Sequence, residues 1–73
     1  MYSKTDAKEL LKLGESIRKK RVELKISQAQ LAFELGTDGR HIRRIEKGEV
    51  NVSFLTLKKI SISLNIEVSD FFV

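Results

Sequence analysis

The chain has 73 residues, of which 33% are charged and 41% are hydrophobic, and its formal net charge is +4. This length allows one domain with a small core, and the composition is that of a folded protein and not of a disordered chain. The absence of cysteine excludes disulfides and thiolate metal sites. No apolar run approaches the roughly 18 residues of a membrane helix, and residues 1–9 lack a signal-peptide core, so we expect a cytoplasmic protein.

Five short helical segments are predicted, of which the first begins near the N-terminus. Asp6 is expected to cap it, because Glu9 follows at the spacing of a capping box. Gly14 is expected to weaken or divide this helix. Mostly apolar side chains recur at three- and four-residue steps and predict its buried face: Leu10, Leu13, Ile17, Arg21 and Leu24.

The second helix is predicted to begin at Ser27, with Gln30 as the partner in a second capping box. Gly36 follows this helix and supplies an end that needs a positive φ. The small Ala32 allows a close approach of the next helix. The inner face of the second helix is expected to consist of Leu31, Ala32 and Leu35.

The third helix is predicted to be capped by Asp38, to run to Lys47 and to stop at Gly48, with Ile42 and Ile45 as its apolar anchors. A helix fits the major groove of DNA, where arginine can donate two hydrogen bonds to guanine. Residues 28–47 therefore predict a helix-turn-helix that binds double-stranded DNA. Its outward face is polar and almost entirely cationic: Arg40, His41, Arg43, Arg44 and Lys47.

The fourth helix is predicted to begin at Ser53 and to end at Asn65, which tolerates a left-handed conformation. Ile and Ser alternate from Ile60 to Ile66 as in a strand, but the extension back to Phe54 fits a helical face better. Its inward residues are expected to be Phe54, Leu57, Ile60, Ser61 and Leu64, and a short last turn is expected to hold Val68, Phe71 and Phe72. The whole predicts one compact all-α domain over residues 1–73, with residues 1–8 as an N-terminal extension.

From Leu13 to Phe72 the sequence resembles the phage repressor/Cro-type (XRE) helix-turn-helix family. The resemblance implies a five-helix, lambda-repressor-like domain that binds DNA and regulates transcription. The matching points keep the family's spacing throughout: Leu13-Gly14-Glu15-Ser16-Ile17-Arg18, Ser27-Gln28, Leu31-Ala32, Leu35-Gly36, Ile42, Ile45-Glu46-Lys47-Gly48, Leu57, Ile60, Leu64 and Ile66.

The resemblance also implies roles for individual residues. Base edges are expected to face Asp38, Gly39, Arg40 and Arg44, but Gly39 has no side chain, which moves the reading of sequence onto the two arginines. Lys25 stands where the family usually has glycine, and a left-handed conformation there would cost about 1–2 kcal/mol. Phosphate contacts are expected from Gln28, His41 and Arg43, and a buried ion pair is expected between Arg21 and Glu46.

Other interpretations of these residues are weaker. A cationic face is often only solvated, but its place on the third helix of this motif favours DNA. Lys19 and Lys20 are expected to face solvent. His41 is the single histidine and cysteine is absent, so neither a metal site nor a cofactor is expected. Glu9, Asp38 and Glu46 already have capping or pairing roles, which argues against an enzyme.

Leu55 and Ile62 are seven residues apart on the fourth helix and lie off its inward face. An exposed apolar patch on a small domain favours a partner, and we expect a homodimer whose third helices enter successive major grooves of a near-palindromic operator. The alternative is an antitoxin-like module that neutralises a protein partner through its apolar tail and N-terminal segment while binding its own promoter. The patch is expected to include Leu55, Ile62, Ile66, Phe71, Phe72 and Val73, unless Phe71 folds over the core.

Overall fold

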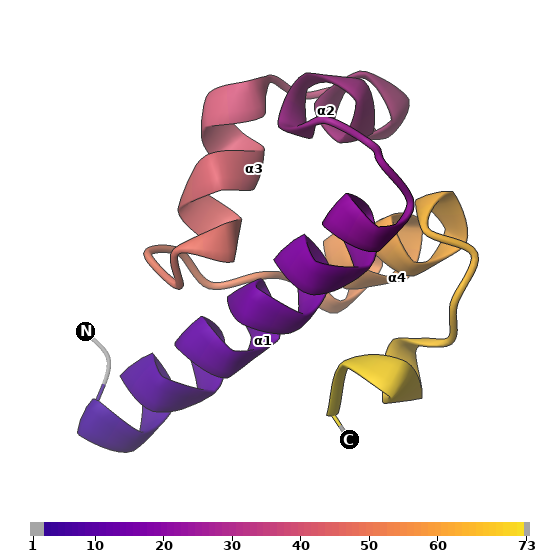
Figure 1. Cartoon of the computed structure of the whole chain (residues 1–73). Helices are drawn as coiled ribbons and strands as arrows, with labels where there is room; N and C mark the ends of the chain where they lie inside the picture. The colour runs from indigo at the N-terminus through magenta and orange to yellow at the C-terminus, as the bar shows by residue number, and fades with distance from the viewer. Residues whose placement is uncertain (1–2, 73) are drawn as a thin grey trace.

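The computed structural model describes residues 3–72 and contains four α-helices followed by a 3₁₀ helix (Figure 1). The long α1 runs diagonally, with α2 and α3 packed at one side and α4 and η1 at the other. Within residues 3–72 no strand forms, which confirms the all-α prediction, although the fifth segment is a 3₁₀ and not an α-helix. The elements are α1 (Lys4–Glu23), α2 (Gln28–Leu35), α3 (Gly39–Glu46), α4 (Phe54–Ser63) and η1 (Val68–Phe72).

The N-cap of α1 is Ser3, three residues before the predicted cap. The Ser3 hydroxyl accepts a hydrogen bond from the Asp6 backbone N–H at 3.1 Å, and the Asp6 carboxylate accepts one from the Ser3 N–H at 3.4 Å. The prediction that Asp6 caps the helix with Glu9 is therefore wrong. Two overlapping capping boxes share Asp6, and the chain uses the earlier one, which makes the helix longer. Residues 4–8, expected as an extension, are part of α1.

Gly14 does not divide α1, which runs unbroken through it. A Cβ at this position would lie 2.5 Å from the backbone carbonyl oxygens of both Ile45 and Glu46. The residue therefore allows the backbone of α1 to touch the end of α3, and the prediction that it divides the helix is wrong. Packing between helices, and not helix propensity, decides what this glycine does.

The caps of the shorter helices form as predicted. Ser27, Asp38 and Ser53 each accept a hydrogen bond from the backbone N–H three residues ahead, at 3.0, 3.0 and 3.1 Å. The second half of the box at Ser27 is not made, because the Gln30 amide donates to Glu34 instead. Among residues 3–72, four adopt a positive φ at or near helix ends: Lys25, Gly36, Gly48 and Asn65.

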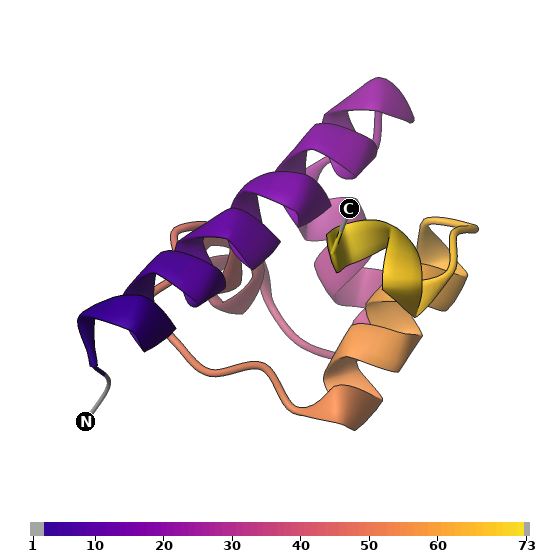
Figure 2. The same cartoon turned by 90° about the horizontal axis from the view of Figure 1, so that it is seen from below.

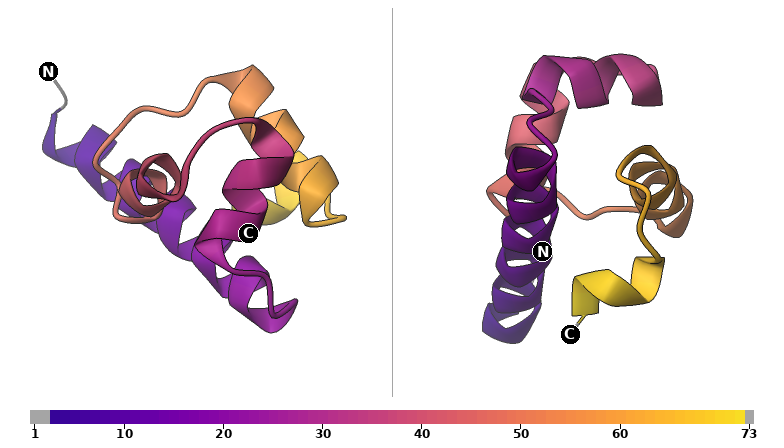
Figure 3. Two further views of the ribbon diagram at one scale, coloured as in Figure 1. Left: turned by 90° about the horizontal axis from the view of Figure 1, so that it is seen from above. Right: turned by 45° about the vertical axis from the view of Figure 1, so that its right-hand side comes forward.

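The core lies between α1, α3, α4 and η1, with α2 across one end (Figures 2 and 3). Leu24 and Phe54 were expected inside but are 48% and 67% exposed. Leu24 is the C-cap of α1 and Phe54 is the first residue of α4, so both stand at a helix end. Leu10 and Leu35 are partly buried. The buried hydrophobic residues are Leu13, Ile17, Leu31, Ala32, Ile42, Ile45, Leu57, Ile60, Leu64 and Phe71.

The C-terminal turn splits its two phenylalanines. Phe71 is buried against the core, whereas Phe72 points outward and Val68 is half-buried. Phe71 therefore folds over the core, as the alternative to its place in the apolar patch predicted. Val73, expected in the apolar patch, and residues 1–2 of the predicted extension lie outside the described residues. None of the helices in residues 3–72 has the length and apolar character of a membrane span.

Candidate nucleic-acid interface

Helix α3 is fixed by its apolar side. Ile42 and Ile45 are fully buried in the core, and Asp38 caps the first turn through its Oδ1, which accepts from the His41 N–H. The reversal before it is made by Gly36, whose φ of 76° ends α2. Because both anchors lie on one side of α3, its other side is held facing solvent.

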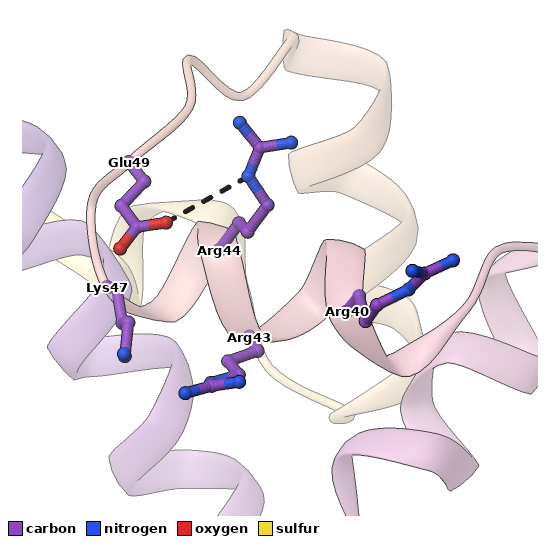
Figure 4. A pocket seen from close by; sticks show the side chains of 5 residues that line it. All are labelled: Arg40, Arg43, Arg44, Lys47 and Glu49. Atoms are coloured by element: carbon purple, nitrogen blue, oxygen red, sulfur yellow. Dashed lines mark ion pairs between the residues drawn. The ribbon is translucent and has the colours of Figure 1, made fainter.

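Five side chains around this outer side line an open hollow of about 310 Å³ (Figure 4). Arg44 and Lys47 extend to opposite sides of α3 in this view, and Arg40 lies at its N-terminal end. Four of the five are cations, and the fifth is a carboxylate. The lining residues are Arg40, Arg43, Arg44, Lys47 and Glu49.

A second hollow of about 400 Å³ lies beside the first and shares two of its residues. It is lined by Asp38 and His41 together with Arg40 and Arg44. The two arginines expected to read bases are therefore central, four residues apart on α3. His41 flanks them in one hollow and Arg43 in the other, so the structure brings together five of the seven residues expected at DNA.

Gly39 and Gln28 are the remaining two. Gly39 is the first residue of α3 and lies against α2, where an added Cβ would meet only Ala29 at 3.9 Å. Gln28 is the first residue of α2, and its amide Nε2 donates to Glu46 Oε1 at 3.1 Å. Its side chain thus joins a buried network as well as standing at a helix N-terminus.

The centre of that network is the ion pair between α1 and α3. Arg21 Nε and Nη2 donate to the two oxygens of Glu46 at 2.7 and 3.1 Å, and Nη1 donates to the Ile26 carbonyl at 2.7 Å. The two side chains are only 10% and 3% exposed. With Gln28, the single carboxylate of Glu46 holds α1, α2 and α3 together, and its geometry is the bidentate one that arginine favours.

Both central arginines face a carboxylate. Arg40 Nη2 lies 3.8 Å from Asp38 Oδ2, and Arg44 Nε lies 3.9 Å from Glu49 Oε1. These pairs are exposed and stabilise the fold little. Glu49 was not among the predicted site residues. Its position could have been found from the glycine that ends α3, because the residue after a helix-ending glycine folds back towards the last turn.

The residues predicted for a protein interface do not form one surface. Leu55 and Ile62 project from α4 and are 72% and 68% exposed. Ile66 is half-buried and packs on the core, yet it lines the same hollow as Ile62. Phe72 instead lines a hollow with Glu9 and Lys12 of α1 and is set apart from the others.

Across residues 3–72 no group of three potential metal ligands is present, so His41 does not belong to such a group.

A family model described as "Helix-turn-helix" matches residues 17–71, which includes every element from the middle of α1 to η1. The protein belongs to the phage repressor/Cro-type (XRE) helix-turn-helix family. As a member of this family, it is a DNA-binding transcriptional regulator and not an enzyme.

Similar proteins place it near one group within the helix-turn-helix family. It is 35% identical over 63 residues to the control protein C.MunI of Mycoplasma sp, and the match covers 85% of each chain. The crystal structure of the restriction-modification controller protein C.AhdI from Aeromonas hydrophila is 33% identical, with a TM-score of 0.86 over 90% of this chain and 96% of that one. The clp gene regulator ClgR from Corynebacterium glutamicum shares the fold, with a TM-score of 0.85 and 22% identity over 88% of this chain and 68% of its own.

Proposed function

We propose that this protein is a homodimeric controller that binds a near-palindromic operator in double-stranded DNA and regulates the genes of a restriction-modification system. The observation that carries this proposal is the outer side of α3, where Arg40 and Arg44 stand at the centre of a cationic surface on a rigidly anchored helix. The identities of 35% to C.MunI and 33% to C.AhdI support the controller role.

Arg40 and Arg44 are the proposed readers of base sequence. They are one helical turn apart, exposed, and able to present paired N–H donors to O6 and N7 of guanine in the major groove. Asp38 keeps one oxygen free of its capping bond and can accept from the N4 amino group of cytosine. Gly39 contributes only its backbone and lets α3 approach the bases closely.

Gln28, His41 and Arg43 are the proposed phosphate contacts. Gln28 stands at the N-terminus of α2, where free backbone N–H groups favour an anion. Its amide keeps a second N–H for phosphate while the first is held by Glu46. Contacts of this kind fix the register of α3 on the duplex, and the base contacts then select the sequence.

The proposed dimer forms through the exposed side of α4, with Leu55 and Ile62 at its centre and Ile66 beside them. Phe72 lines a different hollow, with Glu9 and Lys12 of α1, and is left out of the proposed interface. A twofold axis there would present two copies of α3 to successive major grooves, about 34 Å apart. Two half-sites double the contacts, which a domain of this size needs for a tight specific complex.

Selection of bound duplexes from a random DNA pool tests this proposal. The expected result is an inverted repeat whose half-site centres are about 10 base pairs apart, with guanine at fixed positions in each half. A pool that shows no enriched sequence would overturn the proposal. The antitoxin-like alternative instead predicts that a second protein copurifies with the chain in a fixed ratio when both genes are expressed together.

A further inference from the structure

Glu49 is the single carboxylate among the five residues that line the cationic hollow of α3. Its place is set by the end of the helix. The Glu49 N–H donates to the carbonyl of Arg44 at 2.9 Å, and the Gly48 N–H donates to that of Ile45 at 3.0 Å, with Gly48 at a φ of 72°. These two bonds form the Schellman motif, in which the residue after the glycine is held against the last turn. The backbone of Glu49 is thus bound to Arg44, which is also the residue that the Glu49 side chain faces.

The side-chain contact engages only one part of the Arg44 guanidinium. Glu49 Oε1 lies 3.9 Å from Nε, and the two terminal nitrogens point away from Glu49 (Figure 4). Those terminal nitrogens carry the paired donors that fit O6 and N7 of guanine. Glu49 therefore orients Arg44 while leaving its base-reading end free.

The Glu49 carboxylate also affects the binding of a phosphate and of a guanine base to Arg44 differently. A DNA phosphate carries a full negative charge, whereas the edge of a guanine is neutral. Glu49 repels a phosphate that approaches Arg44 and neutralises the arginine charge that would attract it, but it has a much smaller effect on a neutral acceptor. Non-specific binding to DNA depends almost wholly on phosphate contacts, so a carboxylate here weakens binding to random DNA more than binding to the operator.

We propose that Glu49 is a specificity-determining residue, which positions Arg44 for guanine and suppresses its contacts with phosphate. This inference rests on the proposed function, since it assigns to Glu49 a part in the same reading surface. It adds a second acidic residue, besides Asp38, to a site in which the other charged side chains are cations.

The test compares Glu49→Gln with the wild type on the selected operator and on a random duplex, by fluorescence anisotropy over a range of salt concentrations. Glu15→Gln is the matched control, because Glu15 is an exposed residue of α1 outside the hollow and its substitution changes the net charge equally. We expect Glu49→Gln to bind random DNA roughly two- to fivefold more tightly, as expected for an exposed charge pair. Its salt dependence on random DNA should steepen by about 0.9 per protomer, which is the effect of one added phosphate contact.

A second comparison separates the effect on Arg44 from an effect of net charge. In an Arg44→Ala background, Glu49→Gln should leave the affinity for random DNA nearly unchanged, because the arginine that it releases is missing. The same gain with and without Arg44, an equal gain in Glu15→Gln, or an unchanged ratio of operator to random affinity would overturn the role of Glu49. A wild-type protein that selects no sequence at all would overturn the proposed function and this inference with it, so the two failures are distinct.

Discussion

Replacement of Gly14 by alanine should destabilise the protein, although helix propensity alone favours alanine over glycine by about 1 kcal/mol. The added Cβ would lie 2.5 Å from the carbonyl oxygens of Ile45 and Glu46, whereas ordinary contact begins at 3.4 Å. Both oxygens belong to the backbone, so no rotation of a side chain relieves the overlap. The middle of α1 and the end of α3 must therefore separate by about 0.9 Å, the difference between these two distances.

The magnitude follows from what this separation disturbs. Overpacking of a core contact costs about 1–3 kcal/mol. A shift of 0.9 Å would also lengthen the bond between Arg21 Nε and Glu46 Oε2 from 2.7 Å to about 3.6 Å, and the loss of a charge-assisted hydrogen bond costs about 1.5–3 kcal/mol. After the gain in helix propensity, Gly14→Ala should lower the free energy of unfolding by roughly 2–5 kcal/mol.

Urea unfolding followed by circular dichroism, at one fixed protein concentration, measures this change. Gly39→Ala is the matched control, because its Cβ would meet only Ala29 at an ordinary 3.9 Å, and it should leave the free energy of unfolding unchanged or raise it by up to about 1 kcal/mol. A Gly14→Ala protein as stable as the wild type would refute the reasoning, since propensity would then outweigh the contact between α1 and α3.

Three further predictions concern the ion pair, the reading surface and the dimer. Arg21→Met should lower the free energy of unfolding by about 3–5 kcal/mol in urea titrations, because it leaves Glu46 buried without its partner; a loss below 1 kcal/mol would contradict this. Arg44→Ala should reduce discrimination between the operator and random DNA by about 1–3 kcal/mol, whereas Lys19→Ala should have a much smaller effect, and equal small losses would count against the reading role. Ile62→Asp should give a monomer by light scattering, and an unchanged mass would disprove the interface on α4.

The sequence predicts well what a few neighbouring residues decide. Ser27, Asp38 and Ser53 cap their helices as expected, because a short polar side chain and the N–H three residues ahead form the cap without help from the rest of the fold. Asn65 also ends its helix in the left-handed conformation. Where two local signals overlap, as at the start of α1, the pattern gives the type of cap but not which residue forms it.

The remaining features depend on contacts between distant segments. Gly14 was misjudged because its role is set by α3, which is about thirty residues away along the chain. Leu24 and Phe54 follow the apolar period of their helices, but the period does not show that the side chains at these helix ends lie outside the core. Glu49 was missed because its place beside Arg44 arises from the turn after α3 and not from helical spacing.

The anchoring of α3 has a consequence for how such a regulator acquires a new operator. Ile42, Ile45 and Glu46 fix the helix from below through the core and the network with α1 and α2, and the exposed positions 40, 43, 44 and 47 make no contribution to the buried core. Substitutions at these exposed positions, which include the proposed DNA contacts, should therefore alter recognition with little effect on folding stability. A chain divided in this way can change its target DNA during evolution, or by design, one side chain at a time, while the scaffold that presents α3 stays the same.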